Sequence, residues 1–305
     1  MNKLPADFQQ KLDEYKEVFL ASRNFAFNTR KNYLVDITQL LDFLASKGIT
    51  ELQRVGLRDL RLWMAELDRK GRTGTTGARK ASSVKSFFGF LKADEHIQNN
   101  IAEQLPLPEK ETKIRRVLST EEYKRLELAV ANEPKIAAII EILLQTGIRL
   151  SELVNLNIDD VRLPVKITKD EDGAGALLIQ GGKRRKDRIV PLNYKACRAV
   201  KAWLQARPQV QTNALIISKF ANSSNNGRIT PGGVQKLVGK RFKEVGIQNA
   251  SIHAFRHTCA THMLVNGAKV TSIRDMLGHK DLSTTSIYLS LMQEQMAKDA
   301  QNCAL

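Results

Sequence analysis

The segment Lys135-Ile-Ala-Ala-Ile-Ile-Glu-Ile-Leu-Leu-Gln-Thr-Gly147 carries the clearest helical signal in this chain of 305 residues. Its large apolar residues recur at i, i+3, i+4, i+7 and i+8, which is the stripe that a helix turns toward a core. Gly147 suits the end of that helix, because glycine adopts the left-handed backbone of a C-terminal cap without strain. Upstream, Ser119-Thr-Glu-Glu122 has the capping-box pattern with which another helix begins. The residues from Ser119 onward are therefore predicted to open a helical domain.

Two short apolar runs after this helix have the character of β-strands. They are Ala176-Leu-Leu-Ile-Gln180 and Asp187-Arg-Ile-Val-Pro-Leu192, and they flank Gly181-Gly-Lys-Arg-Arg-Lys186. Apolar runs on either side of a glycine-containing turn favour a hairpin, here with a strongly basic tip. Helical patterns dominate again from Asn193. The expected fold class is mainly α with a small β-hairpin or sheet.

The first hundred residues also have helical periodicity. One helix is expected from Asn28 to Ser46, before Gly48, and two further amphipathic runs carry Trp63 and Phe87. Residues 104–117 contain two prolines and many charges but no periodicity, as linkers between domains do. We expect a helical domain over 1–103, a linker over 104–117 and a second domain over 118–305.

The composition is strongly basic, with 48 Lys and Arg against 32 Asp and Glu and a formal charge of +16. Such an excess favours a polyanionic partner, nucleic acid first, although many basic proteins bind no nucleic acid specifically. No apolar stretch approaches the roughly 20 residues that span a bilayer, and residues 1–7 lack the apolar core of a signal peptide. The three cysteines stand far apart with no CxxC pair, so no disulfide framework is expected. We expect a cytoplasmic protein with no membrane partner.

Several basic clusters are candidates for phosphate contacts. The glycine-rich loop 70–79 can offer backbone amides and arginines to phosphates, although a solvated turn is the simpler interpretation. A later amphipathic helix has a cationic face that can lie along DNA or merely face solvent. The candidate DNA contacts from these clusters and from the hairpin tip are Arg79, Lys80, Arg184, Arg185, Lys236 and Lys240.

Four segments of the second domain carry groups suited to phosphate chemistry. In the first, Thr146-Gly-Ile-Arg-Leu-Ser-Glu-Leu153, Arg149 stands where a new helix starts, so that its guanidinium and nearby amides can hold a phosphate. A surface ion pair with Glu152 is the alternative. The second segment is the hairpin tip, where the ammonium of Lys183 can protonate a leaving oxygen or only touch phosphates.

The third segment is His253-Ala-Phe-Arg-His-Thr-Cys-Ala-Thr-His262, which places His253 and Arg256 near the amino end of a helix. That position suits an oxyanion. A zinc site would need His253, His257 and His262, but the five-residue second step takes His262 off the shared face, and no HExxH pattern is present. No metal ion is therefore expected, and His257 and His262 are interpreted as structural or supporting groups.

The fourth segment is Leu277-Gly-His-Lys-Asp-Leu-Ser-Thr-Thr-Ser-Ile-Tyr288, in which Gly278 suits the end of one helix before the next begins. His279 and Tyr288 lie nine residues apart in it. Taken alone, Tyr288 between two aliphatic neighbours would be interpreted as a packed residue with its hydroxyl at the surface.

Together these groups follow the order and local spacing of the tyrosine recombinase (phage integrase) family, which the sequence resembles: Arg149, Lys183, His253-x-x-Arg256, His279 and Tyr288. The resemblance spans most of residues 115–290, and the helical first hundred residues look like that family's core-binding domain. Size and layout are most similar to Xer-type recombinases. Two departures are a somewhat long segment 161–180 and an arginine after Lys183, where a second glycine is common.

The resemblance implies that Tyr288 attacks the scissile phosphate of DNA and leaves a 3′-phosphotyrosyl link and a free 5′-hydroxyl. No cofactor is expected, because the phosphotyrosine keeps the bond energy and the arginines neutralise the charge, so that neither ATP nor a divalent metal is needed. The implied roles are proton removal by His253, a phosphate clamp of Arg149 and Arg256, a further donor in His279, protonation of the 5′-oxygen by Lys183, and support by Glu152.

The resemblance also implies that two domains clamp duplex DNA and that a homotetramer forms on two DNA sites, with residues 289–305 docking onto a neighbour. Accessory proteins or a partner recombinase can join it. A mobile-element integrase or resolvase and a chromosome-resolution enzyme would use the same residues. A type IB topoisomerase would act as a monomer without pairing sites, and a catalytically silent DNA-binding protein of this fold would form no covalent adduct.

Overall fold

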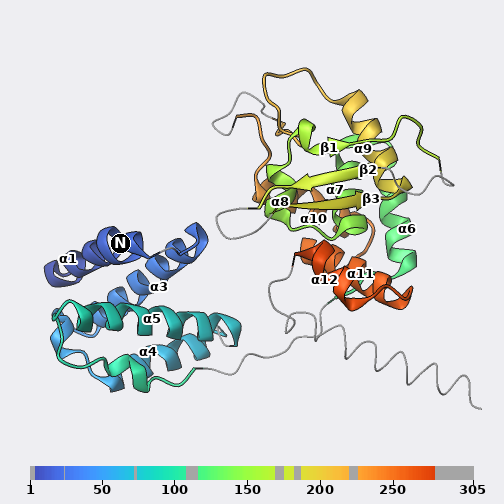
Figure 1. Ribbon diagram of the computed structural model, residues 1–305. Coiled ribbons are helices and arrows are strands. Elements are labelled where there is room, and N and C mark those ends of the chain that lie inside the picture. The colour runs from blue at the N-terminus through green and yellow to red at the C-terminus, as the bar shows by residue number, and fades with distance from the viewer. Residues whose placement is uncertain are drawn as a thin grey trace, which may run out of the picture. The chain divides into compact units, whose positions relative to one another are not determined.

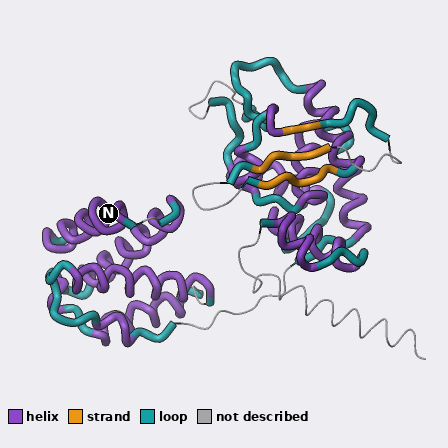
Figure 2. The backbone as a smooth tube through the Cα atoms, in the orientation of Figure 1, coloured by secondary structure: helices purple, strands orange, loops and turns teal. Residues whose placement is uncertain are grey.

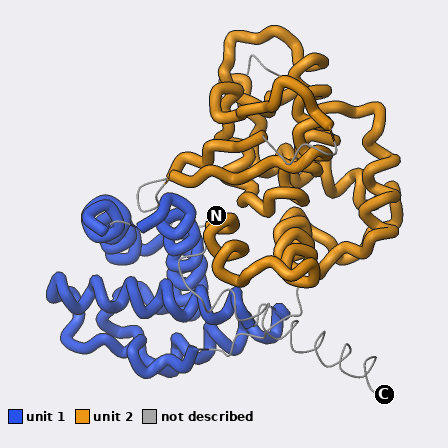
Figure 3. Tube along the Cα trace, turned by 45° about the vertical axis from the view of Figure 1, so that its right-hand side comes forward, with its two compact units in different colours: residues 1–113 blue, residues 114–305 orange. Residues whose placement is uncertain are grey.

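The computed structural model of the chain describes residues 4–23, 25–71, 74–107, 116–168, 175–181, 187–219 and 226–278. The chain divides into two compact units, Met1–Lys113 and Ile114–Leu305 (Figure 3). This division falls within the segment 104–117, where the sequence predicts a linker. Inside the described ranges, no helix has both the length and the apolar character of a membrane span.

The first unit is built from helices, without a strand among its described residues (Figure 2). The predicted helix 28–46 is confirmed, and its end lies just before Gly48, whose φ of +80° is one that glycine adopts readily. A π-helical stretch, Tyr15–Phe19, follows the first helix, and Leu52–Arg54 and Ile101–Gln104 are 3-10 turns. The α-helices are α1 (Ala6–Glu14), α2 (Leu20–Ser22), α3 (Phe27–Ser46), α4 (Leu57–Arg69) and α5 (Thr75–Ala93).

An aromatic cluster fills the core of this first unit. Tyr15, Phe87 and Phe90 are fully buried, and the rings of Tyr15 and Phe87 meet edge to face with centroids 5.1 Å apart. The Tyr15 hydroxyl donates a hydrogen bond to Ser86 Oγ at 2.9 Å, which satisfies the one polar group of that ring. Leu105 packs into the same core at 2% exposure, so the core reaches into the predicted linker.

The second unit packs a small sheet against helices (Figure 1). The capping box predicted at Ser119 is confirmed, with Glu122 N bonded to Ser119 Oγ and Ser119 N to Glu122 Oε2. A 3-10 turn spans Ile158–Asp160. The α-helices are α6 (Thr120–Ala129), α7 (Pro134–Thr146), α8 (Leu150–Asn155), α9 (Tyr194–Ala206), α10 (Pro231–Glu244), α11 (Ile252–Val265) and α12 (Val270–Leu277).

The sheet contains the predicted hairpin and one further strand. Its order is β1 (Val161–Arg162), β2 (Gly175–Ile179) and β3 (Arg188–Leu192), and both pairings are antiparallel. Leu177 pairs with Val190 and both are buried, whereas their neighbours Leu178 and Ile189 are exposed. One face of the sheet therefore joins the core of the unit. The hairpin tip, residues 182–186, lies outside the described residues.

Helix α7 is the centre of this core. The predicted stripe is buried, and so are Ala138 and Ile142 on the other sides of the helix, as expected for a helix surrounded by others. It packs against α8, α9, α10 and α11 and against β3. Gly147 ends it with φ +62°, as predicted. This ending turns the chain sharply toward α8, where the candidate site begins.

Candidate active site

Arg149 occupies the position immediately before the first turn of α8. Its backbone N donates to Glu152 Oε2 at 2.8 Å, and its Nη1 donates to Glu152 Oε1 at 2.9 Å. The ion pair considered from the sequence is therefore present. It is no loose surface pair, because the side chains of Arg149 and Glu152 are only 23% and 10% exposed. The bonds to Glu152 thus fix the orientation of the Arg149 side chain at the amino end of α8.

Arg256 lies one turn into α11 and is buried. Its Nη1 donates to the carbonyl oxygen of Gly147 at 2.6 Å, and its Nη2 donates to that of Leu277 at 2.8 Å. Carbonyl groups at the carboxyl ends of helices lack intrahelical donors and carry partial negative charge. Arg256 therefore satisfies the ends of α7 and α12 together and ties these two helices to α11.

The two arginines of the predicted phosphate clamp meet at the carboxyl end of α12. Arg149 Nη1 donates to Leu277 O at 3.3 Å and Nη2 donates to Gly278 O at 2.9 Å, so Arg149 and Arg256 share one carbonyl. Gly278 has φ +66°, the left-handed ending predicted from the sequence. The next residue in the sequence is His279. The fold thus gathers Arg149 and Glu152 from the start of α8 and Arg256 of α11 at the carboxyl end of α12.

Arg188, the first residue of β3, belongs to the same cluster and was missed in the sequence. Its Nη1 and Nη2 donate to Glu152 Oε1 and Oε2 at 3.1 and 2.8 Å, and its Nε donates to Met276 O at 3.0 Å. Strand alternation could have found it, because Arg188 shares a face with Val190 and Leu192, which point into the core.

Glu152 is the anion that holds this cluster together. Burial raises the pKa of Glu152, but hydrogen bonds from the Arg188 side chain and the Arg149 backbone, together with both positive charges, outweigh burial and lower it to about 2. The carboxylate is therefore ionised at any physiological pH. Its contribution is electrostatic and positional, as expected for a supporting residue.

His253 lies in the first turn of α11 with an exposed side chain, one turn before Arg256. Residues spaced i and i+3 share a helix face, so the imidazole and the guanidinium stand on the same side of α11. His253 is thus reachable from solvent next to a buried cation. An approaching anion could meet both groups at once.

Several predicted site residues lie outside the described residues. They include the expected nucleophile Tyr288, the expected general acid Lys183 and the expected donor His279, together with the tip residues Arg184 and Arg185.

Lys80, a candidate DNA contact, is buried in the first unit at 2% exposure. Its Nζ donates to Asp36 Oδ1 at 2.9 Å and to Gln39 Oε1 at 2.6 Å, and Asp36 is fully buried. Arg79 and Ser83 also donate to the Asp36 carboxylate. The expectation that Lys80 contacts DNA is therefore corrected: its ammonium balances a buried carboxylate. Arg79 pairs with Asp36 as well, but 37% of its side chain is exposed.

The basic face of α10 has exposed lysines and one arginine held by two carboxylates. Lys236 is exposed, and Lys240 is 69% exposed with a loose pair to Glu244 at 3.8 Å. Arg241, by contrast, is 14% exposed and bonds Glu133 and Glu244 at 2.6 Å each. The exposed lysines of α10, which are Lys236, Lys240 and Lys243, are the cations of this helix that can reach a phosphate.

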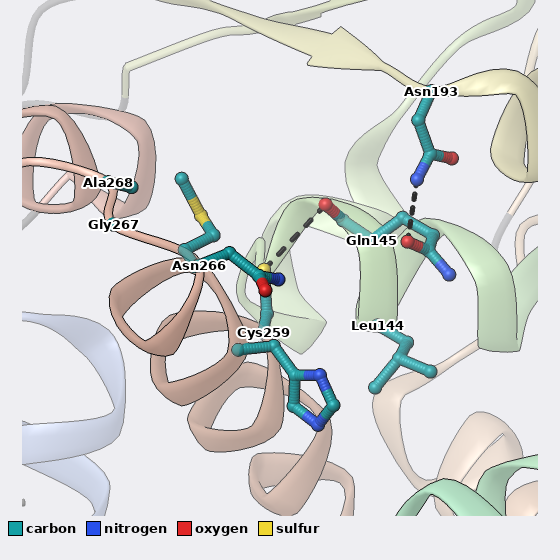
Figure 4. A pocket seen from close by; sticks show the side chains of 9 residues that line it. Leu144, Gln145, Asn193, Cys259, Asn266, Gly267 and Ala268 are labelled. Carbon is teal, nitrogen blue, oxygen red and sulfur yellow. Dashed lines mark hydrogen bonds between the residues drawn. The ribbon is translucent and has the colours of Figure 1, made fainter. Parts of the chain in front are cut away.

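A pocket of about 500 Å³ lies elsewhere on the second unit (Figure 4). In it, Asn193 Nδ2 donates to Gln145 Oε1 at 2.7 Å, and the Cys259 thiol lies 3.7 Å from the Gln145 carbonyl oxygen. His262 also lines it. Arg149, His253 and Arg256, the predicted catalytic residues that the structure describes, are not among the residues that line it. Nowhere in the described ranges do three His, Cys, Asp or Glu side chains gather as metal ligands would.

Two family profiles cover most of the chain. The profile described as "Phage integrase family" matches residues 116–295, and that described as "Phage integrase, N-terminal SAM-like domain" matches residues 12–95. The first match alone spans more than half of the sequence. The two matches fall one in each compact unit.

Relatives are similar along nearly the full length. "Tyrosine recombinase XerC" of Anoxybacillus flavithermus is 30% identical over 93% of this chain and 94% of its own, and "Tyrosine recombinase XerD" of Rhizobium meliloti is 30% identical over 95% and 94%. A structure of the Tn1549 transposon integrase with a circular intermediate DNA shares the fold, with TM-score 0.70 and 19% identity over 94% of this chain and 99% of that one. The chain therefore belongs to the phage integrase family and is a site-specific tyrosine recombinase, an enzyme that breaks and rejoins DNA.

Proposed function

We propose that this recombinase cleaves duplex DNA with Tyr288 as its nucleophile and with Arg149 and Arg256 as the clamp on the scissile phosphate. The observation that supports the clamp is the convergence of both guanidiniums on the Leu277 carbonyl, two residues before His279. A guanidinium can donate to two oxygens in one plane, which suits the nonbridging oxygens of a phosphate. In this proposal the scissile phosphate replaces the carbonyl oxygens at the end of α12 as the acceptor of hydrogen bonds from Arg149 and Arg256.

The phenol of Tyr288 needs help in the attack, because it is protonated and weakly nucleophilic near neutral pH. We propose that the phenol proton is removed by His253, whose exposed imidazole stands beside Arg256. The Tyr288 oxygen then bonds to phosphorus while the bond to the 5′-oxygen breaks. Arg149, Arg256 and His279 stabilise the charge on the nonbridging oxygens as it develops.

The leaving 5′-oxygen receives a proton from Lys183 at the hairpin tip. The product is a 3′-phosphotyrosyl ester and a free 5′-hydroxyl. Because the ester keeps the energy of the broken phosphodiester, a 5′-hydroxyl from another strand can reverse the step and release Tyr288. The proposal therefore needs neither ATP nor a divalent metal ion.

The proposed substrate is two duplex sites held by a homotetramer. Exchange between two duplexes cuts four strands, and each cut uses one tyrosine, so four protomers are needed. The Tn1549 integrase, whose fold this chain shares, was solved with DNA, which supports binding of duplex DNA here. We assign phosphate contacts in the second domain to Lys236 and Lys240 of α10 and to Arg184 and Arg185, and in the first domain to Arg79.

The remaining assignments follow the resemblance. We propose that residues 1–103 bind the DNA core site, that 104–117 connect the domains and that 118–305 catalyse, with the tail after Tyr288 docking on a neighbour. Accessory proteins or a partner recombinase can adjust the reaction. The enzyme would act in the cytoplasm, where its DNA substrate lies.

The test is trapping of the covalent intermediate. A crossover site would first be selected by the protein from a pool of randomised duplexes, and a nick would then be placed just downstream of the cleavage point, so that the cut end diffuses away. With EDTA present, wild-type protein should give a denaturant-resistant protein–DNA adduct. Tyr288→Phe should give none while binding the same duplex.

Two outcomes would count against the proposal. An adduct that persists in Tyr288→Phe would move the nucleophile elsewhere. Binding without an adduct in the wild type would remove the catalytic assignment. Relaxation of plasmid without recombinant products would instead indicate a topoisomerase, since no pairing of sites is needed for relaxation.

A further inference from the structure

Arg188 connects three parts of the second unit that carry proposed catalytic groups. It is the first residue of β3, five positions after Lys183 in the same hairpin. Its side chain, 15% exposed, reaches Glu152 on α8 and the Met276 carbonyl on α12. Glu152 in turn holds Arg149.

The bonds of Arg188 point in two directions. Its Nη1 and Nη2 form a two-pronged ion pair with Glu152, while Nε donates to Met276 O in the last turn of α12. The planar guanidinium can serve both partners because its donors form a rigid fork. Each of its three nitrogens therefore has a protein partner, and both terminal nitrogens bond the Glu152 carboxylate.

The end of α12 is fitted closely to this guanidinium. A β-carbon on Gly278 would stand 3.1–3.3 Å from Arg188 Cζ, Nη1 and Nε, which is closer than ordinary van der Waals contact. A side chain at Gly278 would press on Arg188. The contact fixes the point from which the chain leads into His279.

We propose that Arg188 is a positioning residue for DNA cleavage, one that locks Glu152, and through it Arg149, to the carboxyl end of α12. The proposal rests on the proposed function, since it needs Arg149 to bind the scissile phosphate. Arg188 touches no substrate in this role. It holds the clamp arginines in a fixed place relative to the carboxyl end of α12.

The expected consequence is a loss of rate rather than of affinity. DNA affinity comes from many phosphate contacts spread over the protein, so one disturbed contact changes it little. Cleavage needs the reacting groups aligned within a fraction of an ångström, so loosening the clamp slows the chemical step. A merely structural arginine would lower stability and leave the rate of bound, folded enzyme unchanged.

Arg228 provides a matched control. It is also a half-buried arginine that anchors α8, but at the opposite end of that helix, where it donates to the carbonyl oxygens of Val154 and Leu156 and to Asn157 Oδ1. These partners lie in and after the last turn of α8, whereas Arg149 precedes its first turn. Arg228→Gln should therefore cost stability in the same helix without moving the clamp.

The experiment uses full-length protein in excess over the nicked duplex with EDTA present. It measures the first-order rate of adduct formation, the Kd for the duplex and the Tm of each variant, at a temperature where all are folded. Arg188→Gln should slow adduct formation on the order of 100-fold with Kd within about threefold of wild type. Arg228→Gln should lower Tm and keep the wild-type rate.

Arg188→Lys keeps a cation beside Glu152 and covers the case in which the neutral variant does not fold. An ammonium lacks the planar fork that serves Glu152 and Met276 O together, so the rate of adduct formation in Arg188→Lys should also fall. A wild-type rate in Arg188→Lys, or an equal loss in Arg228→Gln, would overturn the inference and leave the function intact. If wild type itself forms no adduct, the function and the inference fail together.

Discussion

Gly147 is in direct contact with Leu277: a β-carbon on Gly147 would stand 2.5 Å from Leu277 Cδ2 and 3.3 Å from Cys259 Sγ. The turn between α7 and α8 is thus pressed against both α11 and α12. This closeness allows Arg256 to bond the carbonyl oxygens of Gly147 and Leu277 at once. The clamp depends on the absence of a side chain at position 147.

Gly147→Ala should lower the free energy of unfolding by about 2–3 kcal/mol, because alanine is strained at φ +62° and the added methyl overlaps Leu277. Urea denaturation measures this loss. Gly246→Ala is the control: it has φ +71° but open space around its β-carbon, so only the backbone term of about 1 kcal/mol should appear. Equal losses in the two variants would show that the overlap does not matter.

The Glu152 carboxylate should make stability depend on acid pH. Because the folded-state pKa of Glu152 is lowered from 4.5 to about 2, its stabilising contribution is complete above pH 4.5 and is lost as pH falls toward 2. Urea denaturation at a series of pH values should therefore show a shallower acid loss in Glu152→Gln than in wild type. Glu66→Gln removes an exposed carboxylate paired with Lys70 and should change the profile far less. Parallel wild-type and Glu152→Gln profiles would contradict the ion cluster.

The buried pair of Lys80 and Asp36 should behave as a stability element of the first domain. Lys80→Met removes the buried ammonium from Asp36 but leaves the Arg79 guanidinium on the carboxylate, so the free energy of unfolding should fall by about 3 kcal/mol, the low end for a broken buried pair. Chemical denaturation measures it. The double variant Asp36→Leu, Lys80→Met should recover much of the loss, since no lone charge remains buried. A double variant no more stable than the single one would indicate that hydrogen bonds, not the charge, dominate.

Lys236 and Lys240 of α10 should contribute to DNA affinity through electrostatics alone. Each Gln substitution should weaken binding and reduce the slope of log K against log salt by about 1, with the adduct-forming rate at saturation unchanged. Binding titrations at several salt concentrations provide the slope. A slope equal to that of wild type would remove the residue from the DNA interface.

Sequence reasoning succeeded where the signal was local. The stripe of α7, the capping box at Ser119 and the hairpin flanking residues 181–186 all depend on neighbours a few positions apart. Strand β1 was missed because two residues show no alternation. The π-helical stretch after α1 likewise has no simple periodic pattern.

The residues whose contacts could not be predicted have partners far away in the sequence. Lys80 looked like a loop-side cation because its partner, Asp36, lies 44 positions away and on another helix. Arg188 was placed in the second strand of the hairpin but was given no role, because its partners, Glu152 and Met276, lie 36 and 88 positions away. Charge in a sequence shows what a residue can bind, whereas the tertiary fold decides what it does bind.

The burial of α7 on every side has a consequence for how the protein is made. During synthesis α7 leaves the ribosome long before α11, which covers part of it, because roughly a hundred residues separate the two helices. At ordinary elongation rates its apolar surface stays partly uncovered for roughly 5–20 s. The apolar surface of α7 is thus partly exposed during most of the translation of the second half of the chain. A chaperone that shields such surfaces would raise the yield of folded protein.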